Sequence, residues 1–259
     1  MILIADSGGT NTSWALINNR KKYYYRSEGL HPADLHKKRN LPEELMAVKD
    51  NVNKLFFYGS GCARPTQAMK VRKFLSPVFQ FAHIWIYSDL MALAHGAWGE
   101  KPGLVGVLGT GSSMTYYNGK NLYFEVMSPG KYNDPGSGTD LGMSLLKAFK
   151  NKKLSSPLNA EVNQILNHSK NAEVAQISAT HFLISNLQEP ELLEICKNRF
   201  KAYLDFYKPT WEKYQKPIVF GGSIAHLGRK VLDEVLKEQG IDLQCIIKDP
   251  ISKLVEYYK

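Results

Sequence analysis

The sequence predicts an α/β protein of two domains that repeat one element order, three strands followed by alternating helices and strands. Short apolar runs alternate along the chain with segments whose apolar residues recur at helical spacing. A loop rich in glycine and hydroxyl side chains follows the first strand of each half, at residues 8–11 and 109–112. The length of 259 residues allows one or two domains.

The first half shows the complete order of elements. Strands are expected at residues 2–6, 13–17, 22–27, 55–59 and 83–89, with helices at 42–55, 66–79 and 89–98. Within the first helix, Leu45, Val48 and Val52 recur at helical intervals. Either Ser88 or Asp89 is expected to cap the last helix, because both are good N-cap residues.

The second half repeats this order around a long insertion. Strands are expected at residues 104–109, 113–118, 121–127, 217–222 and 241–249, with helices at 139–150, 229–239 and 250–258 and a helical insertion at about 151–210. Thr139 is the expected cap of the first of these helices. The predicted domains are residues 1–100 and 101–259, with the last helix packing back on the first domain.

The composition favours a soluble globular protein of the cytoplasm. Hydrophobic residues make up 44% and charged residues 22% of the chain. We expect no membrane span, because no apolar run reaches about 18 residues, and no signal peptide, because the first residues lack a basic segment. Three scattered cysteines suit a reducing compartment.

The net charge of +9 raises the question of nucleic acid. Basic residues gather at 18–26 and 36–40, but there is no long basic tail. A solvated basic surface is therefore the favoured interpretation, and no nucleic-acid partner is expected. Anionic substrates such as nucleotides suit this surface equally well.

Several common sites are absent from the sequence. It contains no G-x-x-x-x-G-K-[ST] loop and no G-x-G-x-x-G after a strand. It also contains no H-E-x-x-H and no paired C-x-x-C, so zinc chemistry has no support.

Three features near the ends of strands could carry chemistry. The loop at 8–11 is either an ordinary turn or a phosphate cradle, because small residues let backbone amides converge on an anion. Asp6, at the end of its strand, is either a turn residue or a carboxylate that holds Mg²⁺ through water. Asp89 is either a helix cap or a general base that accepts the proton of an attacking hydroxyl.

Several motifs together resemble a known superfamily. "DSGGTNTS", "VLGTGSSM" and "VFGGSIA" are similar to the two phosphate motifs and the adenosine motif of the sugar kinase, actin and Hsp70 superfamily. "YSDLMALAHGA" and "DPGSGTDLG" resemble segments of its BadF/BadG/BcrA/BcrD and N-acetylglucosamine kinase branch. The resemblance implies two ribonuclease-H-like domains flanking a nucleotide cleft. It also implies ATP-dependent, Mg²⁺-assisted phosphorylation of an aminosugar, with N-acetylglucosamine as the leading candidate.

The same resemblance assigns roles to individual residues. Those expected to bind the nucleotide are Gly8, Gly9, Thr10, Asn11, Gly109, Thr110, Gly111, Ser112, Gly221, Gly222 and Ser223. Those expected at the sugar are His31, Ser113, Asp134 and Ser137. Asp6 would hold the metal ion, and Asp89 would be the catalytic base.

The sequence departs from the family pattern beside the expected sugar site. Pro135 stands where relatives usually carry Glu, Asn133 where they carry Gly, and His31 where they commonly carry Asn. Pro135 and His31 keep one alternative open, a nucleotide-binding sensor. A second alternative within the family is a BadF-type ATPase without sugar kinase activity, such as the iron–sulfur activators of 2-hydroxyacyl-CoA dehydratases, although Cys62, Cys196 and Cys245 show no cluster signature. The expected partners are an aminosugar and ATP, and a homodimer is compatible with the sequence.

Overall fold

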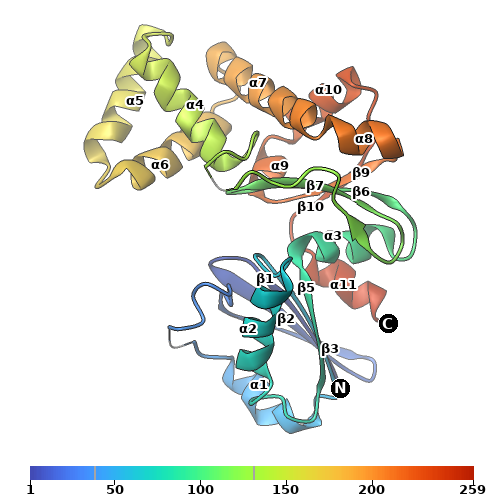
Figure 1. Cartoon of the computed structure of the whole chain (residues 1–259). Coiled ribbons are helices and arrows are strands. Elements are labelled where there is room, and N and C mark those ends of the chain that lie inside the picture. Colours follow the sequence, from blue (N-terminus) through green and yellow to red (C-terminus); the bar gives the residue numbers. More distant parts are fainter. Residues whose placement is uncertain (38, 131) are drawn as a thin grey trace. The chain divides into compact units, whose positions relative to one another are not determined.

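The chain folds into two compact units, each built on one sheet (Figure 1). The structure is a computed structural model that describes residues 1–37, 39–130 and 132–259. Unit 1 comprises Met1–Gly99 and Asp249–Lys259, and unit 2 comprises Glu100–Lys248. Each unit holds a five-stranded mixed sheet, which confirms the predicted α/β class.

The sheet of unit 1 has the strand order β3-β2-β1-β4-β5. Its elements are β1 (Ile2–Ser7), β2 (Asn11–Asn18), β3 (Lys21–Glu28), α1 (Glu43–Val48), the 3₁₀ turn η1 (Lys49–Asn51), β4 (Lys54–Gly59), α2 (Pro65–Leu75), β5 (His83–Ser88), α3 (Asp89–Trp98) and α11 (Ile251–Tyr257). The first three strands form an antiparallel meander, and β4 and β5 continue the sheet parallel to β1.

Both faces of this sheet are covered by helices. Leu3 of β1 packs into one core with residues of α1 and α2, whereas the next residue, Ile4, packs into a second core with residues of α3 and α11. This alternation follows from the two-residue period of a strand. It explains why the central strands are continuous apolar runs.

A polar contact ties the last residues of the chain to unit 1. The buried Tyr58 hydroxyl lies 2.6 Å from Nδ1 of His95 in α3 and 2.6 Å from the Tyr258 hydroxyl beyond α11. Tyr257 stacks on the His95 ring. The C-terminal helix is thus fixed on the sheet of unit 1 by both apolar and polar contacts.

Unit 2 repeats the topology of unit 1 with the strand order β10-β9-β6-β7-β8. Its elements are β6 (Gly103–Leu108), β7 (Ser112–Tyr117), β8 (Leu122–Tyr123), α4 (Gly138–Lys150), α5 (Ser156–His168), α6 (Ala172–Ser185), α7 (Pro190–Phe206), α8 (Lys208–Tyr214), β9 (Ile218–Gly221), α9 (Ser223–Leu227), α10 (Arg229–Glu238) and β10 (Leu243–Ile247). The first strand of the unit again pairs antiparallel with the second and parallel with the fourth.

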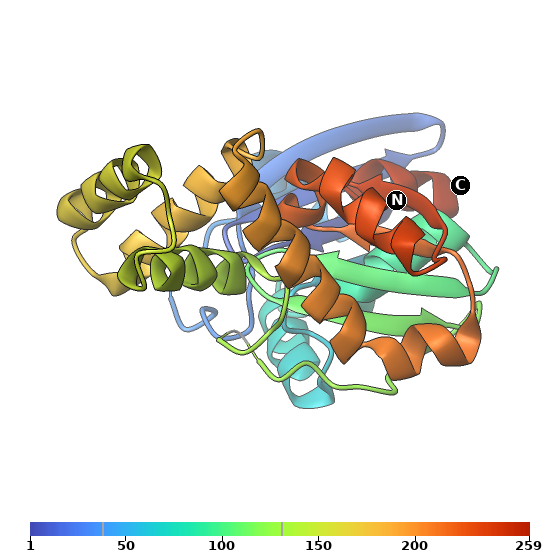
Figure 2. The same cartoon turned by 90° about the horizontal axis from the view of Figure 1, so that it is seen from above.

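The insertion of unit 2 consists of α5–α8. The helices α5 and α6, yellow in Figure 2, extend to one side of the sheet, and α6 packs on α4. Buried residues such as Cys196 and Phe200 of α7 join the core that fills unit 2. Among the described residues, no helix is long and apolar enough to span a lipid bilayer.

Two sequence predictions about unit 2 were wrong in detail. The strand expected at 121–127 is only Leu122–Tyr123, because Glu125 turns away to hydrogen-bond Lys213 and Tyr214 of α8. The cap of α4 is Ser137, whose hydroxyl accepts from the Asp140 amide, and not Thr139.

Candidate active site

In unit 1, three parallel strands end in register. Ser7 of β1 lies beside Gly59 of β4, which lies beside Ser88 of β5. The residues that follow are therefore brought to one edge of the sheet: the loop that begins at Gly8, then Ser60 and Asp89. Ligands of α/β sheets are typically bound at this edge, beyond the carboxyl ends of the strands.

Asp89 is the first residue of α3 but not its cap. The Ser88 hydroxyl performs that role by accepting from the Met91 amide at 3.3 Å. The Asp89 carboxylate accepts from the Leu90 amide at 2.9 Å and from the Ser60 side chain. Burial raises its pKa above the usual value, and these hydrogen bonds together with the charge of His31 partly oppose that rise.

His31 lies at the same edge. Its Nδ1 accepts from the Ala33 amide at 3.2 Å, so the neutral ring carries its proton on Nε2. Gly61 provides the space for this ring, because a Cβ there would lie 2.6 Å from Nε2. Gly61 also has a φ of +79°, which disfavours any other residue.

Asp6 lies half-buried near the end of β1, close to other carboxylates. Burial, with smaller contributions from Asp249 and Asp89, raises the pKa of Asp6 to about 7. A cation would relieve this repulsion, so the site fits a metal ion in its charge. Within the described parts of the chain, no three His, Cys, Asp or Glu side chains converge on one metal position. The fit is therefore to Mg²⁺ held largely by water and phosphate oxygens.

The loop after β1 is a tight turn with an exposed tip. The Gly8 amide donates to the Asn11 carbonyl at 2.9 Å, and Gly9 and Thr10 are exposed between them. Gly9 has open space where a Cβ would stand. An anion could therefore approach this backbone closely, as a phosphate cradle requires.

The matching loop of unit 2 is fixed by its neighbours. The Gly138 amide donates to the Gly109 carbonyl at 2.7 Å, and the Thr139 hydroxyl donates to the Thr110 carbonyl at 2.9 Å. Gly222 passes so close to β6 that a Cβ would lie 2.2 Å from the Leu108 carbonyl, and its φ is +101°. These contacts bring the loop, the start of α4 and the turn after β9 together.

The other residues predicted at the sugar are engaged with their own chain. Asp134 is buried, and its carboxylate accepts from the Ser112 amide at 3.2 Å, the Gly130 amide at 2.9 Å and the Ser128 hydroxyl at 2.5 Å. Ser137 is fully buried as the cap of α4, and the Ser113 carbonyl accepts from Tyr203. These contacts hold the loops in place and give no support to a direct role at the sugar.

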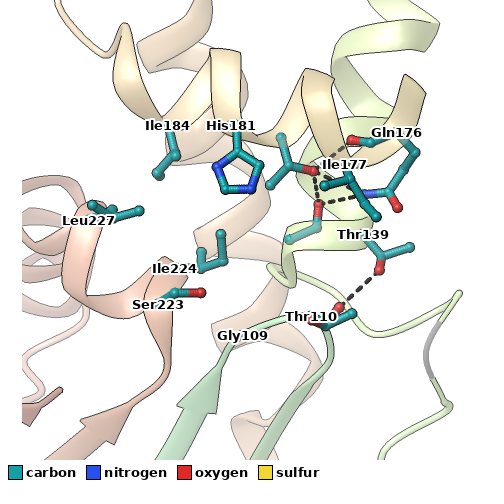
Figure 3. Close-up of a pocket in the computed structure, with 12 residues that line it drawn as sticks. Gly109, Thr110, Thr139, Gln176, Ile177, His181, Ile184, Ser223, Ile224 and Leu227 are labelled. Atoms are coloured by element: carbon teal, nitrogen blue, oxygen red, sulfur yellow. Dashed lines mark hydrogen bonds between the residues drawn. The ribbon is translucent and has the colours of Figure 1, made fainter. Parts of the chain in front are cut away.

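A pocket of unit 2 opens beside the second loop (Figure 3). Its cavity volume is about 110 Å³, within an open depression of about 490 Å³. The residues that line it are Gly109, Thr110, Gly138, Thr139, Gln176, Ile177, Thr180, His181, Ile184, Ser223, Ile224 and Leu227. Apolar side chains, hydroxyl and amide side chains and one imidazole form its walls, and loop backbone forms one end. These are suitable surroundings for a nucleotide base and its ribose.

Two close contacts set the position of the pocket wall on α6. The Thr180 hydroxyl donates to the Gly138 carbonyl at 2.6 Å, and the Gln176 amide nitrogen lies 3.2 Å from the same oxygen (Figure 3). Gly142 permits this approach, because a Cβ there would lie 2.3 Å from the Gln176 carbonyl.

Of the residues predicted to bind the nucleotide, the pocket includes Gly109, Thr110 and Ser223. Gly111 and Ser112 lie in the same loop, where Asp134 holds them, and Gly221 ends β9 within the core. The wall on α6 was not predicted from the sequence. The spacing of apolar residues along α6 identifies only its buried face. In sequence, a helix face that lines a pocket looks the same as a helix face exposed to solvent.

No protein-family model matches the chain, and no curated protein matches it. Solved structures do. One, a candidate N-acetylglucosamine kinase from Porphyromonas gingivalis, aligns over 100% of this chain and 98% of its own, with a TM-score of 0.82 and 24% identity. A second candidate N-acetylglucosamine kinase, from Chromobacterium violaceum, aligns over 100% and 98%, with a TM-score of 0.70 and 16% identity.

A ROK family glucokinase from Streptomyces griseus, solved with glucose and AMPPNP, aligns over 99% of this chain and 97% of its own, with a TM-score of 0.56 and 14% identity. At these identities the likeness is one of fold. The chain therefore has the duplicated α/β fold of the actin-like sugar kinases.

Proposed function

We propose that this protein transfers the γ-phosphoryl group of ATP to a hydroxyl of an aminosugar, with N-acetylglucosamine as the leading acceptor. The observation that carries the proposal is the position of Asp89. Ser88 caps α3, so the carboxylate of Asp89 is not needed as a cap, and it lies with Ser60 and His31 at the edge where the glycine loop begins.

In this proposal Asp89 accepts the proton of the attacking hydroxyl. Its two hydrogen bonds, from Leu90 and Ser60, orient the carboxylate. A raised pKa makes it a better proton acceptor than an ordinary aspartate, provided that it is ionised. His31, which carries its proton on Nε2, would donate to an oxygen of the sugar.

Asp6 and the first loop would serve the phosphates. Bound Mg²⁺ would neutralise charge on the triphosphate, and Asp6 would hold the ion through water. The exposed amides around Gly9 and Thr10 would add donors to phosphate oxygens.

In unit 2 the pocket beside Gly109 would hold the adenine and ribose. Ile177 and Leu227, both exposed at the pocket, offer apolar surface to the faces of a base. Gly109 and Thr110 would then lie toward the phosphates, since the loop backbone closes one end of the pocket. The structural relatives that are candidate N-acetylglucosamine kinases support this assignment and the choice of acceptor.

The test is a screen of free and N-acetylated hexosamines, with ATP and MgCl₂, that measures ADP release and phosphosugar together. We expect equimolar ADP and phosphosugar, with N-acetylglucosamine turned over fastest. Release of ADP at the background rate with every sugar would refute the proposal.

A second function, nucleotide binding without transfer, is favoured by one observation. Asp134 accepts three hydrogen bonds from its own chain, and Pro135 stands where the resembling kinases carry a carboxylate. Calorimetric binding of ATP without turnover of any hexosamine would identify such a sensor.

A further inference from the structure

We propose that Ser7 is a positioning residue that couples the phosphate loop at residues 8–11 to the strap, residues 28–31, which carries His31. The proposal rests on the proposed function for its meaning in catalysis. Its structural basis is a chain of hydrogen bonds between buried groups at the ends of β1, β2 and β3.

The chain of hydrogen bonds involves four groups. The Leu30 amide donates to Ser7 Oγ at 2.9 Å, Ser7 Oγ lies 2.9 Å from Thr12 Oγ1, and Thr12 Oγ1 donates to the Glu28 carbonyl at 3.0 Å. Ser7 and Thr12 are 2% and 0% exposed, so water has little access to the bonds at Ser7, whereas Glu28 at the other end is exposed.

The shorter contacts favour one direction for the protons of this chain. A carbonyl can only accept, and when the single proton of Thr12 points to Glu28 at 3.0 Å, Thr12 accepts from Ser7. The Ser7 hydroxyl thus donates to Thr12 and accepts from Leu30, apart from a longer contact of 3.3 Å with the Gly8 carbonyl. Each hydroxyl donates and accepts once, so loss of either interrupts the whole chain.

The strap also touches the loop directly. The Gly29 amide donates to the Thr10 carbonyl at 2.8 Å, and a Cβ on Gly29 would lie 2.5 Å from the Gly9 carbonyl. Ser7 also contacts the turn after β4. The Ser7 carbonyl accepts from the Ser60 amide at 2.9 Å, and the Ser60 side chain forms a hydrogen bond with the Asp89 carboxylate. One residue therefore joins the loop, the strap and the partner of Asp89.

The consequence is a mechanical link between two binding events. When a bound nucleotide restricts the motion of the loop, the hydrogen bonds of Ser7 and Thr12 also restrict the motion of Leu30. His31 is the next residue. The acceptor would then meet a strap that is already fixed in its binding position, which lowers the entropy lost on binding.

Amide hydrogen exchange tests the link without any need for sugar turnover. In the wild type, AMPPNP with MgCl₂ should slow exchange in peptides covering both 8–12 and 28–33. In Ser7→Ala it should slow only the first, and without nucleotide the Leu30 amide should exchange about tenfold faster than in the wild type, since it has lost its acceptor.

Three further variants separate the link from a general loss of stability. Ser27→Ala also deletes a serine hydroxyl that accepts an N–H, that of Trp14 at 2.9 Å, and that donates to the Glu28 carbonyl at 3.1 Å, but it leaves the bonds among Leu30, Ser7 and Thr12 in place. Thr12→Val interrupts the chain with a side chain of the same shape, and Thr12→Ser keeps the hydroxyl. We expect Thr12→Val to behave as Ser7→Ala, and Ser27→Ala and Thr12→Ser to behave as the wild type.

Kinetics give the second measurement. Ser7→Ala should raise the KM for the hexosamine about tenfold, whereas Ser27→Ala should leave it unchanged. Two results would overturn the link. One is that the nucleotide still slows amide exchange in residues 28–33 of Ser7→Ala. The other is that, without nucleotide, these residues exchange at the same rate in Ser7→Ala and in Ser27→Ala. Failure of the wild type to phosphorylate any sugar would instead refute the proposed function, and the exchange result would stand by itself.

Discussion

The two units have the same strand order but support their glycine loops with different chemistry. In unit 1 the loop is held by neutral groups, the hydroxyls of Ser7 and Thr12 and the backbone of the strap. In unit 2 the loop is held by a buried carboxylate, that of Asp134, and by the start of α4. The same backbone topology can therefore hold its glycine loop either with neutral hydroxyl and backbone groups or with a buried carboxylate.

The difference determines which carboxylates remain for chemistry. The Asp134 carboxylate accepts hydrogen bonds from three groups of its own chain, so its role is to support the loop. In unit 1 the loop is satisfied without a carboxylate, so Asp6 and Asp89 need not support it. In the proposed function, unit 1 therefore supplies the acid–base and metal chemistry, and unit 2 binds the base.

The largest expected effect is that of Asp89→Asn on catalysis. An amide cannot accept the hydroxyl proton as a base, so kcat should fall by about 10²-fold or more, while the Kd for ATP stays nearly constant. Steady-state kinetics and calorimetry measure these two quantities.

Ser88→Ala is the control for this prediction. It removes the true cap of α3 and should lower the stability of unit 1 by about 1 kcal/mol with little effect on kcat. An Asp89→Asn enzyme that keeps most of its kcat would show that this carboxylate is only a structural group.

Asp134→Asn should have the next largest effect, on stability rather than on kcat. The new amide NH₂ must face a group that donates a hydrogen bond, either the Ser112 amide or the groups of Ser128 and Gly130. We expect a loss of about 2–3 kcal/mol from the free energy of unfolding and a higher KM for ATP.

Asp233→Asn is the matched control in the same unit. Asp233 forms an ion pair with Lys237 on the exposed surface of α10, and such pairs contribute less than about 1 kcal/mol. The free energies of unfolding are measured by urea denaturation. Equal losses in Asp134→Asn and Asp233→Asn would mean that the buried carboxylate does not support the loop of unit 2.

The strand order was predictable because its signals are local. Apolar runs, the two glycine loops and the strand-end carboxylates Asp6 and Asp89 can all be identified without knowledge of tertiary contacts. The choice between Ser88 and Asp89 as cap could not be made, since both are suitable and the outcome depends on Ser60 from the turn after β4. The engagement of Asp134 depends on residues 22 positions away, as in its bond from Ser112.

The stability of the two units should also respond differently to acid, because unit 1 contains a buried histidine. His95 of unit 1 is buried, and burial lowers its pKa from 6.5 to about 4. All three histidines of unit 2, His168, His181 and His226, are exposed. A lowered pKa in the folded state means that the unfolded state binds the proton more readily, so the stability contributed by neutral His95 is lost as pH falls below 6.5.

The effect is best measured as a difference between variants, because Asp6 opposes it. The raised pKa of Asp6 makes unit 1 gain stability as pH falls through about 7. We therefore expect the unfolding free energy of the wild type minus that of His95→Gln to fall by about 2 kcal/mol between pH 7 and pH 5. His83→Gln, at an exposed site, should show no such change. A difference independent of pH would mean that folding does not lower the pKa of His95.

The smallest expected effect lies in the pocket of unit 2. Leu227 lines it from the end of α9 with 52% of its surface exposed, so it is not needed for folding. If an adenine ring covers this side chain, Leu227→Ser removes an apolar contact made only in the complex, which corresponds to about 1 kcal/mol. The KM for ATP should rise about fivefold, with no change in the KM for the sugar or in Tm.

Leu166→Ser is the matched control for this last prediction. Leu166 is 36% exposed on α5, in the same unit but outside the pocket, so its replacement should leave both KM values unchanged. Unit 1 offers the opposite comparison, because His31→Ala should raise the KM for the sugar and leave that for ATP unchanged. If Leu227→Ser instead raised the KM for the sugar, the acceptor and not the base would occupy this pocket, and the division of roles between the units would be reversed.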